Sequence, residues 1–300
     1  MNIIEQAAKR LEELQRSGVE VPRRTGTPAN DQARLGAGAR ADGRSRSGVI
    51  DADAGASSKR VEIDLDRLMS MGYLTPSNPR SQIANEFRII KRPLLTNING
   101  QPAAPIDRAN LVMVTSSLPG EGKTFVSVNL AISISMELDC KVLLVDADVS
   151  RPAVLQRLGL PASPGLLDLL TDPLLKMSDA LLRTNIDRLS ILPAGAANGQ
   201  ATELLASDGM SALLEQMASR YSDRVIVFDA PPLLPSTESR VLATRMGQVV
   251  VVVEADRTSH STVAEAMATL EVCPVVLPVL NKTSRSDAGT YYGSYGQLEG

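Results

Sequence analysis

From residue 111 onwards, short apolar runs alternate with segments of helical period. The runs are rich in β-branched residues and lack a polar alternation, which predicts strands buried on both faces. The six predicted strands are residues 111–115, 142–145, 189–192, 225–228, 249–253 and 275–280. Helices are predicted at 123–138, 164–171, 203–220 and 259–271. Strands joined by helices favour a parallel sheet, so the pattern predicts a doubly wound α/β fold with its ligand at the carboxyl ends of the strands.

The first hundred residues follow a different pattern and divide into three predicted parts. Residues 1–17 predict a short amphipathic helix, although a marginal and frayed helix fits the same pattern. Residues 18–60 are rich in Gly, Ala, Arg, Ser and Asp and contain no aromatic residue, which predicts a disordered linker. Residues 61–100 predict a helical lead-in, with a helix over 81–91 that ends before Pro93.

Composition limits the function classes that remain. The 300 residues carry a net charge of −3, which excludes a general nucleic-acid binder. No apolar run approaches ~18 residues and the first residues lack the regions of a signal peptide, so we expect a cytoplasmic protein without a membrane span. Cys140 and Cys273 are expected to be free thiols in apolar surroundings, and the single histidine, His260, leaves little room for a His-based centre.

One Gly-rich stretch, from Ser117 to Thr124, lies between a predicted strand and a predicted helix, which is the order that a phosphate-binding loop requires. Backbone N–H groups of such a loop point at phosphate oxygens, and the helix N-terminus adds partial positive charge. Gly120 and Gly122 allow close approach, Lys123 can reach the β- and γ-phosphates, and Thr124 can ligate Mg²⁺. Ser117 replaces the first glycine of the usual pattern, so a structural turn that happens to carry Lys123 is the alternative.

Two further predicted strands end in acidic residues. Asp146 and Asp148 follow the strand at 142–145, and Asp229 follows the strand at 225–228. In a parallel sheet these strand ends lie beside the phosphate loop. Asp229 could then hold Mg²⁺ directly or through water, Asp146 is placed to accept a proton from an attacking hydroxyl, and Asp148 could serve either role. For any one of them alone, a helix N-cap or a turn residue is the alternative.

These motifs resemble, in order, spacing and flanking residues, the bacterial tyrosine kinases called BY-kinases, which are autokinases of exopolysaccharide and capsule systems. The resemblance rests on Ser-Leu-Pro-Gly-Glu-Gly-Lys-Thr, Val-Leu-Leu-Val-Asp-Ala-Asp-Val-Ser-Arg-Pro and Val-Ile-Val-Phe-Asp-Ala-Pro-Pro-Leu as Walker A, A′ and B motifs, and it covers residues 81 to 300. It implies a P-loop NTPase fold of the deviant Walker, MinD-like class over residues 101–285. It also implies ATP and Mg²⁺ as cofactors.

The residues and the resemblance together give a set of expected site residues. The expected catalytic residues are Lys123, Asp146 and Asp148. The expected nucleotide-binding residues are Ser117, Pro119, Gly120, Glu121, Gly122, Lys123, Thr124, Phe125, Arg151 and Asn281. The expected metal-binding residues are Thr124, Asp146, Asp148 and Asp229. Three alternatives stay open: Arg151 contacts phosphate or pairs with a carboxylate, Glu121 is a solvated loop charge, and Asn281, which the resemblance places at the adenine, is an ordinary strand-end residue.

Residues 286–300 predict a flexible tail that is rich in tyrosine. Tyr291, Tyr292 and Tyr295 lie among Gly and Ser, and the resemblance implies that they are phosphoacceptors, modified in trans by a neighbouring subunit. Mere disorder is the alternative for such a segment.

The segment before the kinase core resembles the family's oligomerisation motif, Glu-x-x-Arg-x-x-Arg, only in part. The matching positions hold Asn85, Arg88 and Lys91, which puts ring formation in doubt. Residues 63–65, 72–76 and 87–95 resemble the autokinases linked to exosortase (PEP-CTERM) polysaccharide loci.

The resemblance implies several partners. One is a membrane protein of the chain-length-determinant type, which would recruit the kinase to the inner face of the plasma membrane and activate it. The others are further copies of this chain and a cognate tyrosine phosphatase.

The sequence therefore predicts an ATP- and Mg²⁺-dependent protein-tyrosine autokinase. One alternative is a MinD/ParA-like ATPase switch, whose Walker A usually carries an extra Lys where this chain has Ser117 and Leu118. Another is a scaffold that binds nucleotide without turnover.

Overall fold

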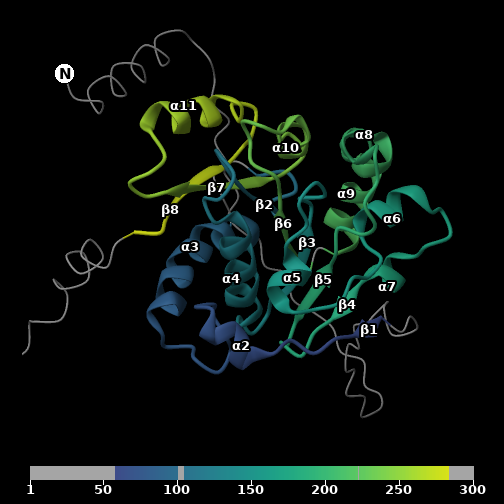
Figure 1. Ribbon diagram of the computed structural model, residues 1–300, viewed down its shortest axis with the longest axis horizontal. Coiled ribbons are helices and arrows are strands. Elements are labelled where there is room, and N and C mark those ends of the chain that lie inside the picture. The colour runs from purple at the N-terminus through teal and green to yellow at the C-terminus, as the bar shows by residue number, and fades with distance from the viewer. Residues whose placement is uncertain (1–57, 101–104, 222, 284–300) are drawn as a thin grey trace, which may run out of the picture. The chain divides into compact units, whose positions relative to one another are not determined.

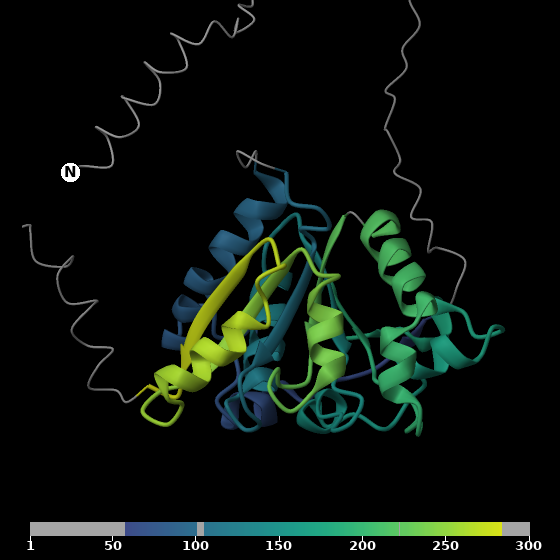
Figure 2. The ribbon, with the colours of Figure 1, turned by 90° about the horizontal axis from the view of Figure 1, so that it is seen from above.

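The computed structural model describes residues 58–100, 105–221 and 223–283. The predicted helix at 1–17, most of the predicted linker, and the tail with its three tyrosines lie outside the described residues. The described part has helices on both faces of a mainly parallel sheet, as Figure 1 and Figure 2 show, which confirms the predicted doubly wound α/β fold.

The sheet brings the expected site strands together. Its strands are β1 (Lys59–Arg60), β2 (Leu111–Ser116), β3 (Lys141–Asp146), β4 (Leu182–Arg183), β5 (Leu189–Leu192), β6 (Arg224–Asp229), β7 (Gln248–Glu254) and β8 (Val276–Asn281). Their order is β1-β4-β5-β3-β6-β2-β7-β8, and every described pair is parallel except β4 with β5. The ends of β2, β6 and β3 are therefore neighbours. All six predicted strands are present, whereas β1 and β4 are too short to give a hydrophobic pattern.

Ten helices surround the sheet in the described part of the chain. They are α2 (Leu65–Ser70), α3 (Gln82–Asn99), α4 (Lys123–Ser135), α5 (Val154–Leu158), α6 (Leu166–Thr171), α7 (Met177–Ala180), α8 (Ala201–Ala206), α9 (Asp208–Arg220), α10 (Thr237–Ala243) and α11 (His260–Ala268). The prediction of one helix over 203–220 is wrong, because Ser207 is extended and separates α8 from α9. Its hydroxyl accepts a hydrogen bond of 3.1 Å from the Met210 N–H and caps α9. Among the described residues, no helix is both long and apolar enough to cross a bilayer.

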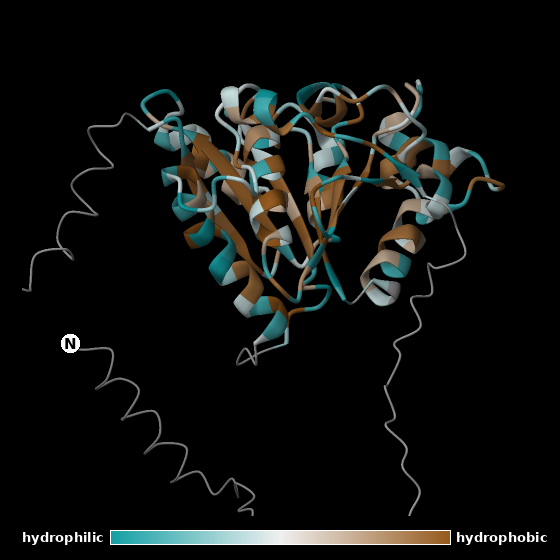
Figure 3. Cartoon of the chain, turned by 90° about the horizontal axis from the view of Figure 1, so that it is seen from below, coloured by the Kyte–Doolittle hydropathy of each residue, from teal (hydrophilic) through white to brown (hydrophobic). Residues whose placement is uncertain are grey.

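Two apolar layers cover the two faces of the sheet. Along β2, Leu111 and Met113 pack into the layer under α6–α11, and Val112 and Val114 pack into the layer under α2–α5. Figure 3 shows hydrophobic residues along the strands and on the inner faces of the helices. Because both faces are covered, successive strand residues are all apolar, which explains the unbroken runs in the sequence.

Helix α3 runs past its predicted end and contains Pro93. The prediction that the helix ends near residue 91 is wrong. Proline lacks the N–H that would bond the carbonyl four residues earlier, which normally ends or kinks a helix. Here Leu94 is fully buried, and Leu95 and Ile98 pack against the same apolar layer. Burial of this second half of α3 offsets the missing hydrogen bond.

Lys91 holds α3 against the end of α4. Its ammonium donates a hydrogen bond of 2.5 Å to the Ser133 carbonyl and lies 2.7 Å from a Glu137 carboxylate oxygen. A cation at the C-terminus of a helix also interacts favourably with the helix dipole. Of the positions that match the oligomerisation motif, Lys91 is thus engaged inside the subunit, while Arg88 is exposed and donates to the Asn85 side chain at 2.5 Å.

The role of α3 beyond Pro93 can be tested by Leu94→Ala. We expect this change to lower the free energy of unfolding by about 3 kcal/mol, because deletion of a fully buried Leu side chain leaves a cavity. The matched control is Leu174→Ala, at a position that is 86% exposed, and its effect should stay within about 0.5 kcal/mol. Urea denaturation measures both values. Equal small effects would contradict the account of α3.

Candidate active site

The phosphate loop joins β2 to α4 and depends on two glycines. Gly120 and Gly122 have φ values of 92° and 101°, in the left-handed region that other residues rarely adopt. A Cβ atom at Gly122 would also collide with the side-chain amide of Asn281. Gly122 is followed at once by the first residue of α4, so the loop ends at a helix N-terminus with its partial positive charge. The backbone therefore has the form of an anion-binding loop.

Lys123, at the start of α4, reaches the carboxylates at two strand ends. Its ammonium lies 2.5 Å from Asp148 Oδ2 and 3.9 Å from Asp229 Oδ1. Asp146 and Asp229 are directly paired in the register of β3 and β6, so the three carboxylates share one end of the sheet. The structure thus brings together the expected catalytic and metal-binding residues Lys123, Asp146, Asp148 and Asp229, which the sequence placed at separate strand ends.

Burial sets the charge balance of this cluster. Burial raises the pKa of Asp229, which is fully buried, while the ammonium of Lys123 acts in the opposite direction. Burial and then the charge of Asp229 raise the pKa of Asp146 to about 7, against the effect of the Val154 N–H. For Lys123, burial acts to lower the pKa, but Asp229 and Asp148 outweigh it, so its pKa is raised. The lysine stays charged and is shared by the acidic groups.

Several buried oxygens in the cluster have no hydrogen-bond partner among the described residues. These atoms are Asp146 Oδ1, the Ser117 hydroxyl and both carboxylate oxygens of Asp229. The hydroxyls of Thr124 and Ser127 are near enough to Asp229 to lower its pKa, but neither forms a hydrogen bond of regular geometry with it. Such atoms are rare in folded proteins, because an unpaired buried polar group is costly. The other Asp146 oxygen accepts hydrogen bonds of 3.1 and 3.0 Å from the Ala153 and Val154 N–H groups, which fixes the carboxylate at the start of α5.

The unpaired oxygens fit a magnesium–nucleotide complex. The described residues contain no ready-made cluster of three His, Cys, Asp or Glu ligands for a metal. Mg²⁺ does not require one, since it commonly takes one or two carboxylates and completes its shell with phosphates and water. Asp229 and the hydroxyl of Thr124, the second residue of α4, are the groups that would supply protein oxygens, and Asp148, which Lys123 contacts, could assist.

Two of the expected loop residues have their side chains occupied within the protein. Glu121 is buried and accepts a 2.7 Å hydrogen bond from the Leu118 N–H and another from the Thr258 hydroxyl, so the alternative of a solvated loop charge is wrong. The Phe125 ring packs against Tyr73, with 4.9 Å between ring centroids, and lies near Phe87. Any contact of Glu121 or Phe125 with a nucleotide would therefore come from the backbone. Pro119, which has no N–H, is exposed.

The two remaining expected residues lie on either side of the loop. The Asn281 amide donates a hydrogen bond of 2.8 Å to the Glu121 carbonyl, so in this structure it contacts the loop itself. Arg151 is exposed and its backbone N–H donates to Asp148 Oδ1 at 3.2 Å. Within the described residues its guanidinium has no hydrogen bond or ion pair, so the phosphate contact and the carboxylate pair both stay predictions.

Sequence reasoning missed Lys282, whose ammonium donates a 2.8 Å hydrogen bond to the Gly120 carbonyl of the phosphate loop. The available signal was its position directly after Asn281, at the end of a predicted strand. Thr258, which bonds Glu121, gave no signal, because it belongs to a turn without a recognisable motif.

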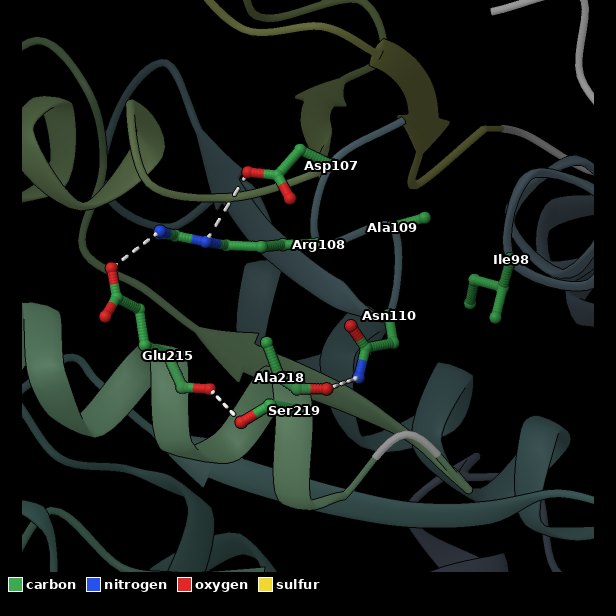
Figure 4. A pocket seen from close by; sticks show the side chains of 8 residues that line it. All are labelled: Ile98, Asp107, Arg108, Ala109, Asn110, Glu215, Ala218 and Ser219. Atoms are coloured by element: carbon green, nitrogen blue, oxygen red, sulfur yellow. Dashed lines mark hydrogen bonds and ion pairs between the residues drawn. The ribbon is translucent and has the colours of Figure 1, made fainter. Parts of the chain in front are cut away.

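A separate cavity of about 620 Å³ lies at the opposite edge of the sheet, where β2 begins (Figure 4). It is lined by Ile98, Asp107, Arg108, Ala109, Asn110, Glu215, Ala218 and Ser219. Its polar groups largely satisfy one another: Arg108 bonds Glu215 at 3.1 Å, and Asn110 bonds the Ala218 carbonyl at 3.2 Å. It contains none of the expected site residues.

Comparison with known proteins agrees with this geometry. The family described as AAA domain matches residues 110–275. The tyrosine-protein kinase YwqD of Bacillus subtilis (strain 168) is 31% identical over 234 residues, which cover 75% of this chain and 93% of YwqD. The succinoglycan biosynthesis transport protein ExoP of Rhizobium meliloti (strain 1021) is 28% identical over 223 residues, which cover 71% of this chain but 26% of ExoP.

A solved structure, the kinase domain of VpsO, matches with a TM-score of 0.54 and 32% identity, covering 68% of this chain and 100% of that domain. The chain thus spans nearly all of YwqD and about a quarter of ExoP. The phosphate loop, the lysine between strand-end carboxylates and these similarities lead to one conclusion. The chain belongs to the bacterial tyrosine-protein kinases.

Proposed function

We propose that this chain is an ATP- and Mg²⁺-dependent autokinase that phosphorylates tyrosines at its own C-terminal end in trans. One observation carries the proposal: Lys123 lies between Asp148 and Asp229 beside an anion-binding loop, where buried carboxylate oxygens are unpaired. Phosphoryl transfer needs this combination of positioned cations and oxygen ligands, because its catalysis is mainly positioning and charge stabilisation.

Each group has a distinct role in the proposed reaction. Lys123 and the loop N–H groups bind the phosphates, and Thr124 and Asp229 hold Mg²⁺ directly or through water, with Asp148 assisting. Bound Mg²⁺ supplies neutralisation of charge on the phosphate oxygens. The tyrosine oxygen forms a bond to the γ-phosphorus as the bond to the β–γ bridging oxygen breaks, and ADP leaves.

Asp146 is the proposed acceptor of the tyrosine proton. Its Oδ2 is used by the N–H groups of Ala153 and Val154, whereas Oδ1 is unpaired, so Oδ1 is the atom that would take the proton. Its pKa of about 7 suits this role, since a general base works best when its pKa is near the working pH.

The proposed acceptors are Tyr291, Tyr292 and Tyr295, which lie outside the described residues. Each phosphotyrosine adds about −1.5 to −2 charges at neutral pH, so a phosphorylated tail would repel its neighbours and change the assembly of copies. A homo-oligomer is part of the proposal because transfer in trans needs two copies.

The proposed setting is the synthesis and export of an exopolysaccharide. ExoP, by its name a succinoglycan biosynthesis transport protein, supports this setting. A chain-length-determinant-type membrane activator that recruits the kinase to the inner face of the plasma membrane, a cognate phosphatase and an exosortase locus remain predictions from the sequence resemblance. The alternative MinD/ParA-like switch gains no support from these relatives, since YwqD and VpsO are both named as kinases.

Lys123→Met should lower phosphotyrosine formation at least ~100-fold, because it removes the cation expected at the transferring phosphate. Mass spectrometry of the purified full chain after incubation with ATP and Mg²⁺ gives the readout, and circular dichroism confirms folding. Lys176→Met is the matched control: Lys176 is exposed, and its ammonium forms no hydrogen bond or ion pair within the described residues. Unchanged phosphotyrosine in Lys123→Met would contradict the proposed function.

Transfer in trans can be tested with two complementary variants. One carries Lys123→Met with an intact tail, and the other keeps the active site but has Phe in place of Tyr291, Tyr292 and Tyr295. Mixed with ATP and Mg²⁺, they should give phosphate on the tail of the Lys123→Met chain, while neither alone gives tail phosphate. Peptide mapping distinguishes the chains. A mixture without tail phosphate would show that transfer does not occur between copies.

The raised pKa of Asp146 predicts a pH-dependent stability in the absence of nucleotide and metal. Between its ordinary pKa of 3.8 and about 7, the folded state binds more protons than the unfolded state. The free energy of unfolding should therefore fall as pH rises through this window, and Asp146→Asn should remove the part of that fall that Asp146 contributes. Urea denaturation of both proteins from pH 4 to pH 8 measures the difference. A difference that does not vary with pH would contradict a buried, proton-binding Asp146.

A further inference from the structure

The end of β8 contacts the phosphate loop on the side of its carbonyl groups. Asn281 donates to the Glu121 carbonyl at 2.8 Å, and the ammonium of Lys282 donates to the Gly120 carbonyl, also at 2.8 Å. Two successive residues of one segment thus hold two successive carbonyls of another segment, about 160 residues earlier in the sequence.

Because these two carbonyls are held, the direction of the next two backbone N–H groups in the loop is fixed as well. A trans peptide unit is planar, and the N–H of each residue points away from the carbonyl of the residue before it. With the carbonyls of Gly120 and Glu121 bound on the side of β8, the N–H groups of Glu121 and Gly122 point to the other side. In the described structure neither N–H donates a hydrogen bond. Successive free N–H groups that point the same way form a concave site for an anion.

Lys282 is itself held in place for this contact. Its ammonium lies 3.1 Å from a carboxylate oxygen of Glu254, at the end of β7, where Glu254 pairs in register with Asn281. Its backbone has a φ of 59°, in the left-handed region that is uncommon for residues other than glycine. The ion pair and the unusual backbone together direct the side chain at the loop.

Lys282 is too exposed to contribute to the packing of the core. Its side chain is 44% exposed, against 13% for Glu254. Loss of the ammonium would leave the Gly120 carbonyl open to water, since Gly120 is exposed as well, and would create no cavity. The contact therefore bears on the shape of the loop more than on the stability of the fold.

We propose that Lys282 is a positioning residue for nucleotide binding, which keeps the phosphate loop in the form that binds an anion by holding the Gly120 carbonyl away from the ligand. This inference rests on the proposed function, because it requires that the loop binds the phosphates of ATP. Lys282 does not touch the reacting atoms. It acts through the backbone of Glu121, whose N–H it orients.

The test is the dissociation rate of a fluorescent ATP analogue, N-methylanthraniloyl-ATP, from the full chain with Mg²⁺, measured by stopped flow. Lys282→Met should raise this rate about tenfold, the effect of losing one charge-assisted hydrogen bond that supports the bound state. Lys282→Arg, which keeps a charged donor, should restore most of the wild-type rate. Lys176→Met, the same change at an exposed position, should leave the rate unchanged.

Two further readouts separate positioning from a structural effect. For Lys282→Met, KM for ATP should rise while kcat at saturating ATP is kept, and the melting temperature without nucleotide should stay that of the wild type. An unchanged dissociation rate in Lys282→Met, or a fall in its melting temperature large enough to explain the faster dissociation, would overturn the inference about Lys282. Neither result would affect the proposed function. Failure of the wild-type chain to bind the analogue would overturn the proposed function as well.

Discussion

The burial of acidic groups at the ends of β3 and β6 is the constraint on which the site depends. Asp146 and Asp229 are register partners on adjacent strands, both are almost fully buried, and three of their four oxygens accept no hydrogen bond of regular geometry in the described structure. Among the described residues, Lys123 is the cation that forms ion pairs with this cluster, at 3.9 Å from Asp229 and 2.5 Å from Asp148. Such an arrangement is unfavourable alone and becomes favourable when a cation occupies it, which links stability to ligand binding.

The neighbouring elements hold this cluster and the phosphate loop in one geometry. The Phe125 ring, in the first turn of α4, packs with Tyr73 and Phe87 of the lead-in, and Lys91 fixes α3 to the other end of α4. On the other side, Asn281 and the residue after it hold the loop carbonyls. The phosphate loop is therefore supported both by residues 61–100 and by β8. A substitution in either segment can alter the loop without contacting the nucleotide.

Much of this could be predicted from the sequence because its causes are local. Strands that are covered on both faces appear in the sequence as apolar runs. A carboxylate directly after such a run lies at the carboxyl end of its strand, so the positions of Asp146 and Asp229 could be predicted. The rest depends on contacts between distant segments. Leu94 keeps α3 helical beyond a proline through burial, and Glu121 is buried because it bonds Thr258, which lies 137 residues away. No local pattern carries that information.

The most direct test of this account is the thermal stability of Asp229→Asn, compared with the wild type, with and without ATP and Mg²⁺. Without ligand, the variant should be the more stable protein, because it removes one of the three buried acidic groups that share the ammonium of Lys123. With ATP and Mg²⁺ the order should reverse, since only the wild type keeps the full set of metal ligands. A variant that is less stable without ligand, or that gains as much as the wild type from ATP and Mg²⁺, would contradict the central claim.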